Sequence, residues 1–353
     1  MKSYRNEKRS TGMKQIKTED ARGQVLCHDV TRIIKGVSKD PVFRRGHVIS
    51  QEDIPLLLSL GKDHVYIWET RRNMLHEDEA AEILGHLCQG PNMHSKGPQE
   101  GKIELFADID GLFMADLERL RALNSLGEMI IAARTSGFPV KKGDKLCGTR
   151  VIPLVIEKEK IERACHVAGK EPLFRLLPFR AKSFGLITTG NEVFHGRIKD
   201  TFSSVMQEKM AEYHCEMIEH TILDDDTEKI TLAINDMLAR GADMVLCTGG
   251  MSVDPDDKTP LAIKNTGASV VSYGAPVLPG SMFLIAYTRD NRPICGLPAC
   301  VMYAQRTIFD LVLPLLLADL PVTSQWLSGL GNGGLCLNCA DCHFPNCMFG
   351  KGD

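Results

Sequence analysis

The feature that most constrains the fold is a series of short apolar runs in the second half of the chain. Six runs rich in Val, Ile and Leu have the length of buried strands: residues 184–188, 217–223, 243–248, 269–273, 283–287 and 293–296. Amphipathic stretches at residues 201–215 and 227–240 lie between them and predict helices. This alternation predicts an α/β domain with a wound, mostly parallel sheet and helices on both faces.

Polar loops follow these apolar runs. They are TTGNEV (residues 188–193), DDD (224–226), CTGGMSVDPDDKTP (247–260), LPG (278–280) and CGLPAC (295–300). In an open α/β sheet, ligands bind outside the carboxyl ends of the strands, where loop N–H groups and helix N-termini carry partial positive charge. The loops therefore predict one anion or cofactor site on a single rim of the sheet.

The loop at residues 247–260 has the most specific chemistry. Gly249 and Gly250 directly follow an expected strand and would let the backbone approach a ligand closely. The same loop offers oxygen atoms that could hold Mg²⁺ against a phosphate, from Ser252, Asp254, Asp256 and Asp257. In a second interpretation, Asp256 or Asp257 only caps a helix that begins near Pro260. The sequence leaves both interpretations open.

The order of these motifs over residues 181–325 resembles the molybdopterin-binding domain shared by molybdopterin adenylyltransferases, molybdopterin molybdenumtransferases and competence/damage-inducible proteins. The resemblance implies a molybdopterin-binding fold whose ligand is molybdopterin or its adenylate, held with Mg²⁺. As cofactor-binding residues it implicates Gly190, Gly249, Gly250, Ser252, Pro279, Gly280 and Pro298. As catalytic residues it implicates Asp257, Glu192 and Asp225.

Three functions follow from this resemblance. Residues 16–70 resemble the start of a molybdenumtransferase, which favours insertion of molybdenum. The expected partners are then molybdate and a molybdoenzyme, and a homo-oligomer is expected. The chain has no counterpart of that family's DRSAMDGYA stretch, which keeps open a non-catalytic molybdopterin carrier or sensor. The third possibility is a nucleotide pyrophosphatase of the competence-protein type.

The C-terminal tail is a separate signal. Its cysteines, Cys336, Cys339, Cys342 and Cys347, have the spacing C-x2-C-x2-C-x4-C. Thiolates this dense predict a metal site, holding either Zn²⁺ or an Fe–S cluster. All these ligands lie within one short segment, so we expect the tail to bind its metal independently of the α/β domain and to be dispensable for folding.

Composition completes the picture. Boundaries are expected as follows: a disordered arm at 1–15, a small module at 16–75, a β-rich middle module at 76–180, the α/β domain at 181–325 and the metal-binding tail at 326–353. The net charge of −3 gives no reason to expect nucleic acid as a partner. No apolar run has the length and purity of a membrane span or a secretory signal. The cysteines outside the tail are dispersed, which favours the cytoplasm.

Overall fold

The computed structural model describes residues 13–34, 38–68, 73–252, 254–255 and 257–352. The chain divides into two compact units. The first comprises Met1–Asp108, Ala115–Arg134 and Lys142–Leu176, and the second comprises Ile109–Met114, Thr135–Lys141 and Leu177–Asp353. Three short segments of the expected middle module, 109–114, 135–141 and 177–180, therefore belong with the α/β domain and the tail, and the finer domain boundaries stay a prediction.

The N-terminal part of the first unit contains two antiparallel strand pairs. β1 (Met13–Lys17) pairs with β4 (His64–Trp68), and β2 (Val30–Ile34) pairs with β3 (Ser38–Phe43). The turn η1 (Thr18–Asp20) and the helix α1 (Asp53–Ser59) complete it, around an apolar core that includes Leu26, Ile49, Leu57 and Val65.

The expected disordered arm was placed at residues 1–15. The structure contradicts this for residues 13–15, because they form the start of β1 and β4 pairs with their backbone. Residues 1–12 lie outside the described part of the chain.

The middle of the first unit contains an antiparallel sheet in the order β6-β7-β11-β9. Its strands are Met93–Gln99, Lys102–Ala107, Lys145–Val151 and Met129–Ala133, respectively. A further pair joins β5 (Met74–His76) to β12 (Val155–Glu157). Of the helices α2 (Glu77–Cys88), α3 (Leu117–Ser125) and α4 (Lys158–Ala168), only α2 was expected, so this region is less purely β than the sequence predicts.

A small sheet in the order β10-β8-β13 is formed by Phe138–Val140, Gly111–Ala115 and Phe174–Pro178.

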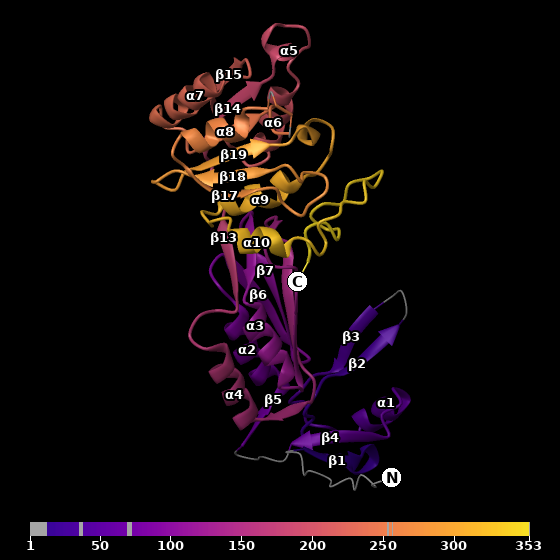
Figure 1. Cartoon of the computed structure of the whole chain (residues 1–353). Coiled ribbons are helices and arrows are strands. Elements are labelled where there is room, and N and C mark those ends of the chain that lie inside the picture. Colours follow the sequence, from indigo (N-terminus) through magenta and orange to yellow (C-terminus); the bar gives the residue numbers. More distant parts are fainter. Residues whose placement is uncertain (1–12, 35–37, 69–72, 253, 256, 353) are drawn as a thin grey trace, which may run out of the picture. The chain divides into compact units, whose positions relative to one another are not determined.

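The α/β domain is built on a six-stranded sheet in the order β15-β14-β16-β19-β18-β17 (Figure 1). Its strands in that order are Glu216–Leu223, Ser183–Thr189, Met244–Thr248, Pro293–Leu297, Leu284–Tyr287 and Ser269–Tyr273. The first four are parallel, whereas β18 pairs antiparallel with both β19 and β17. The sheet is therefore mixed, and the parallel arrangement is confined to one side of it.

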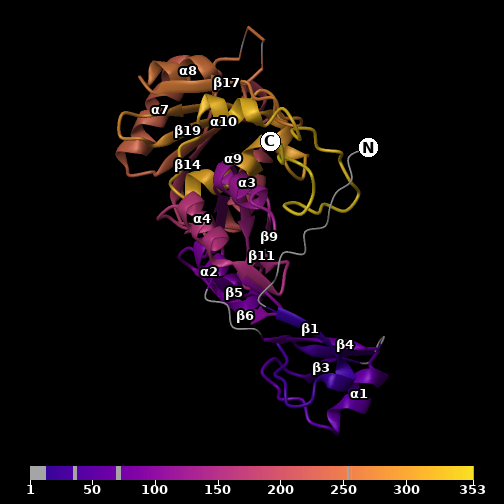
Figure 2. The same cartoon turned by 90° about the horizontal axis from the view of Figure 1, so that it is seen from below.

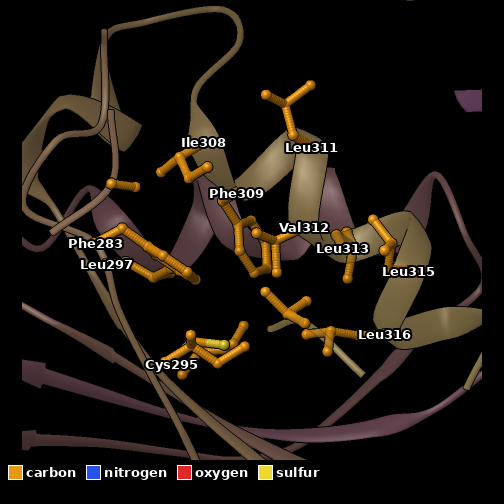
Figure 3. Packing of buried hydrophobic residues seen from close by; sticks show 14 of the residues in the cluster. Phe283, Cys295, Leu297, Ile308, Phe309, Leu311, Val312, Leu313, Leu315 and Leu316 are labelled. Carbon is orange, nitrogen blue, oxygen red and sulfur yellow. The ribbon is translucent and has the colours of Figure 1, made fainter. Parts of the chain in front are cut away.

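Helices cover both faces of this sheet (Figure 2). Side chains that alternate along each strand enter two different cores. One core joins the sheet to α6 (Phe202–Ala211) and α9 (Ile308–Leu317), and the other joins it to α7 (Thr227–Ala239) and α8 (Thr259–Asn265). Figure 3 shows the first core, where Phe309 and Val312 of α9 lie with Cys295 and Leu297 of β19 and with Phe283, the residue before β18.

Three short helical segments remain among the described residues of this unit: α5 (Asn191–Phe194), η2 (Ala299–Met302) and α10 (Ser324–Gly329). α5 and η2 follow the carboxyl ends of β14 and β19. Because β14, β15, β16 and β19 run parallel, their carboxyl ends meet at one edge of the sheet. The polar loops that follow these four strands are thereby brought together.

Candidate ligand-binding site

The centre of the site is the turn that follows β16. Gly249 and Gly250 have φ angles of +86° and +55°, a region that side-chain-bearing residues rarely adopt. A Cβ atom at residue 249 would lie 2.1 Å from the carbonyl oxygen of Thr189. The turn thus packs directly on the end of β14 and leaves its own backbone as the surface offered to a ligand.

Thr259, the first residue of α8, holds this turn in place. Its buried hydroxyl donates a hydrogen bond of 2.9 Å to the carbonyl oxygen of Gly249, and its N–H donates to the carbonyl oxygen of Gly250 at 3.3 Å. The hydroxyls of Thr189 and Thr259 are 3.3 Å apart. Side chains from two elements therefore fix the position of a glycine backbone, as preorganised anion binding requires.

A second glycine turn follows β14. Gly190 has a φ of +137°, and a Cβ atom there would lie 3.1 Å from a carboxylate oxygen of Glu192. The N–H of Asn191 donates to the Asp225 carboxylate at 3.1 Å. The loops after β14 and β15 are thus joined next to each other, with Glu192 and Asp225 on the same side.

These loops enclose a cavity of about 440 Å³, which we call the rim pocket. Eight of the predicted site residues line it: Gly190, Glu192, Asp225, Gly249, Gly250, Ser252, Asp257 and Pro298. Its remaining walls come from Thr189, Val193, Ile198, Lys199, Thr201, Phe202, Met251, Asp254, Met282, Ala299 and Met302. Residues spread over more than a hundred positions of sequence therefore share one cavity.

Two predicted residues do not line the rim pocket. Pro279 lines a different cavity, next to the C-terminal tail. A Cβ atom at Gly280 would lie 2.5 Å from Cγ2 of Ile308, so the chain needs glycine there for packing against α9. The LPG loop follows no strand of the parallel side of the sheet, which explains why it is not on that rim.

Asp257 does not cap α8. The N-cap residue of that helix is Lys258, which makes no capping hydrogen bond through its side chain. A carboxylate oxygen of Asp257 instead accepts the N–H of Asp254 at 3.3 Å, so the two aspartates form one local turn. Of the two interpretations left open by the sequence, capping is wrong for Asp257, and Asp256 lies outside the described residues.

Charge is unevenly distributed around the rim pocket. Four of its lining residues are acidic, Glu192, Asp225, Asp254 and Asp257, whereas Lys199 is its one described basic lining residue. Tyr273 does not line the pocket, but its hydroxyl donates to the carbonyl oxygen of Met251 at 2.8 Å and so holds the loop that carries Asp254 and Asp257. Partial burial and the nearby Asp257 carboxylate raise the pKa of Tyr273.

Several residues of the rim pocket that sequence reasoning missed lie on one segment. Ile198, Lys199 and Thr201 belong to the connection between α5 and α6, and Phe202 is the first residue of α6. That segment carries no glycine pair or acidic run. Its position directly after the TTGNEV loop was the available signal, because a connection that starts at the rim has to pass over it.

The tail cysteines line the other cavity. This cavity of about 610 Å³, which we call the cysteine cavity, takes in Cys336, Cys339, Cys342, His343 and Cys347. Among the described residues, no three His, Cys, Asp or Glu side chains are grouped so that they could hold a metal ion, and this applies to both cavities. Neither Mg²⁺ nor a tail metal therefore has a ready-made ligand set in the described part of the chain.

No helix within the described ranges has the length and apolar character needed to cross a membrane.

Comparison with known proteins agrees with the geometry of the α/β domain. Residues 185–318 match the family described as a probable molybdopterin binding domain. The domain built on the six-stranded sheet therefore belongs to the molybdopterin-binding domain superfamily. Residues 15–69 match a family described as a domain of unknown function, so their likeness to the start of a molybdenumtransferase stays a prediction.

Among curated proteins, the chain is 29% identical over 202 residues to a molybdopterin molybdenumtransferase of Haemophilus influenzae, an alignment that covers 55% of this chain and 47% of that protein. It is 36% identical over 78 residues to a CinA-like protein of Desulfosudis oleivorans, covering 22% of this chain and 19% of the relative. The chain thus matches less than half the length of either relative.

Among solved structures, a molybdopterin biosynthesis enzyme of Thermus thermophilus is 21% identical, with 38% of this chain and 91% of that chain covered and a TM-score of 0.31. A molybdenum cofactor biosynthesis protein of Pyrococcus furiosus is 15% identical, with 88% of this chain and 66% of that chain covered and a TM-score of 0.27.

Proposed function

We propose that this protein binds molybdopterin, free or adenylated, in the rim pocket and acts in molybdenum cofactor biosynthesis as a molybdopterin molybdenumtransferase-like enzyme. One observation carries the proposal: the glycine turns after β14 and β16 and the carboxylates of three loops line a single cavity, in a domain of the molybdopterin-binding superfamily. The relative called a molybdopterin molybdenumtransferase supports the choice of reaction.

In this proposal the phosphate of the pterin lies against the turn at Gly249 and Gly250. Backbone can approach a ligand there because neither residue has a side chain, and Thr259 keeps the turn from moving away. Lys199 supplies the positive charge that faces a bound phosphate. Met282, Ala299 and Met302 provide the apolar wall that would face the pterin ring.

Mg²⁺ would be held by one or two of the carboxylates Glu192, Asp225 and Asp257 together with oxygen atoms of the ligand. This partial protein ligand set suits magnesium, which keeps several waters and commonly uses substrate phosphates. When bound, the ion would offset negative charge on the phosphate or adenylate.

The proposed partners follow from the proposed reaction. Molybdate would be the source of molybdenum, and a molybdoenzyme would receive the finished cofactor. A homo-oligomer and a cytoplasmic location are part of the same proposal, and sedimentation of the purified protein would test the former.

Two other functions remain as outcomes of the test. A nucleotide pyrophosphatase of the competence-protein type is favoured by the 36% identity over 78 residues to a CinA-like protein. A carrier or sensor is favoured by the absence from the sequence of a stretch like DRSAMDGYA.

The deciding experiment uses full-length protein purified anaerobically from cells that make molybdopterin. We expect denaturation in air to release a fluorescent oxidised pterin, and AMP to be released when adenylated molybdopterin and molybdate are supplied with Mg²⁺. Hydrolysis of a free dinucleotide in place of AMP release would favour the pyrophosphatase. Pterin retention with neither reaction would favour the carrier, and absence of pterin from the folded protein would contradict the site.

For the tail, the proposal includes a bound metal, Zn²⁺ or an Fe–S cluster, at Cys336, Cys339, Cys342 and Cys347. It is supported by the spacing of these cysteines and by their common cavity.

A further inference from the structure

The cysteine cavity has an unusual combination of walls. Its thiol-bearing residues are accompanied mainly by apolar and aromatic side chains, those of Pro279, Tyr303, Ala304, Leu335, Leu337, Met348 and Phe349. Cys339 and Cys342 are exposed, whereas Cys336 and Cys347 are half-buried. A volume of about 610 Å³ is larger than one metal ion with its ligands needs, and it leaves room for a group of several atoms.

Aromatic residues of the tail anchor the cysteines to the α/β domain. Phe349 is buried in the core that contains α9, and the ring centroid of Phe344 lies 6.3 Å from that of Phe349 and 6.1 Å from that of Phe138. The N–H of Cys336 donates to the carbonyl oxygen of Leu278 at 2.8 Å. Both ends of the cysteine-bearing segment are therefore fixed, while Cys339 and Cys342 between them remain accessible.

The sequence spacing distinguishes between classes of metal site. Structural zinc sites commonly draw their ligands from two pairs separated by a longer stretch of chain. Here Cys336, Cys339 and Cys342 form an uninterrupted C-x2-C-x2-C run, and Cys347 follows after four residues. Three cysteines in such a run are typical of segments that wrap around an Fe–S cluster. An apolar wall suits a cluster, because it limits the contact of the sulfur atoms with solvent, which is one of the factors that set the reduction potential of a cluster.

The cysteine cavity also has a defined position relative to the rim pocket within the second unit. Pro298, Ala299 and Met302 line the rim pocket, whereas Tyr303, Ala304, Gln305 and Arg306 line the cysteine cavity. On the loop before β18, Pro279 belongs to the cysteine cavity and Met282 to the rim pocket. The same two short segments therefore contribute residues to both cavities.

We infer that the cysteine cavity binds an Fe–S cluster, rather than zinc, through Cys336, Cys339, Cys342 and Cys347. This inference rests on the proposed metal binding by the tail and specifies the metal. Each thiol loses its proton as its sulfur bonds to iron. Because no three of the described ligands are grouped around one point, the exposed Cys339 and Cys342 move inward as the cluster binds.

The test uses the full-length chain, purified anaerobically and also reconstituted with ferrous iron and sulfide. We expect iron and acid-labile sulfide in comparable amounts, together with broad visible charge-transfer absorption that is lost on exposure to a chelator and air. The double variant Cys339→Ser, Cys342→Ser should lose most of the iron and the absorption. As a matched control, Cys165→Ser changes a half-buried cysteine of the first unit and should keep both.

Other outcomes overturn the inference. About one zinc per chain, without iron or sulfide, would show that the tail is a zinc site. Absence of both metals after reconstitution, in a chain that circular dichroism shows to be folded, would reject metal binding by the tail altogether. Pterin in the denatured supernatant of the same samples is measured separately, so failure of the cluster and failure of the rim pocket are distinguishable.

Discussion

The carbonyl oxygen of Thr189 lies 2.1 Å from the position that a Cβ atom of residue 249 would occupy, so only glycine fits at Gly249. This contact joins the end of β14 to the turn after β16. Because of this contact, the shape of the rim pocket depends on a residue that has no side chain. Substitutions at Gly249 therefore test the site directly.

Gly249→Ala should be much more destabilising than an alanine at another glycine with positive φ. Gly267 is the matched control, because it has a φ of +81° and nothing within 4 Å of an added Cβ. We expect Gly267→Ala to cost about 1–2 kcal/mol of unfolding free energy from backbone strain. Gly249→Ala should cost about 2–5 kcal/mol, because overpacking adds to that strain. Urea denaturation measures both, and equal losses would contradict the contact.

The related substitution Gly250→Ala should affect ligand binding more than folding. A Cβ atom there would meet the hydroxyls of Thr259 at 2.9 Å and Thr189 at 3.1 Å, which are side-chain atoms that can shift. Movement of Thr259 would release the hydrogen bond that holds Gly249. We expect at least about tenfold weaker pterin retention, equal to 1.4 kcal/mol. Retention equal to that of the unaltered protein would place the phosphate elsewhere.

Adjacent aspartates provide a test of the acidic side of the rim pocket. Asp225 lines the cavity, whereas Asp226 caps α7 by accepting the N–H groups of Glu228 and Lys229 at 2.9 and 3.1 Å. Asp225→Asn should raise the Mg²⁺ concentration needed for half-maximal turnover by about tenfold or more. This is the scale of lost metal affinity when groups that support a metal site are changed. Asp226→Asn should leave that concentration unchanged, because Asn caps helices about as well as Asp.

The titration of turnover with Mg²⁺ is the measurement for both variants. If they respond alike, Asp225 takes no part in holding the ion.

The tail should be required for the stability of the second unit, contrary to the expectation that it is dispensable. Phe349 is only 4% exposed within the core, whereas its neighbour Met348 is 74% exposed. Phe349→Ala should therefore cost about 3–5 kcal/mol, and Met348→Ala little. Thermal denaturation of both variants checks this. A chain ending near Gly331 that unfolds at the same temperature as the full-length protein would show that the tail contributes nothing.

The first unit should lose stability as pH rises through the weakly acidic range. Burial, followed by the neighbouring Asp78, raises the pKa of Glu77 from 4.5 to about 7. The folded state then holds a proton that the unfolded state releases, so the contribution of Glu77 is present below pH 4.5 and is lost between about pH 4.5 and 7. Glu77→Gln should flatten this dependence of the denaturation midpoint, whereas Glu82→Gln, on the exposed side of α2, should not.

The sequence by itself determined the local elements of the α/β domain and most of its rim. Strand β17 has the bounds predicted for it, and the others differ by one or two residues, because runs of Val, Ile and Leu report burial directly. Glycine pairs after such runs, as at Gly249 and Gly250, mark a local backbone requirement, because glycine adopts positive φ without steric cost.

Only the tertiary structure decided what depends on contacts between distant segments. It directed Gly280 to pack against Ile308, placed Pro279 in the cysteine cavity and brought Lys199 into the rim pocket. It also buried Phe349 with α9, which no local pattern in a cysteine-rich tail indicates. Periodicity reports which side of an element is buried but not what covers it, and these positions are set by the packing of segments far apart in the chain.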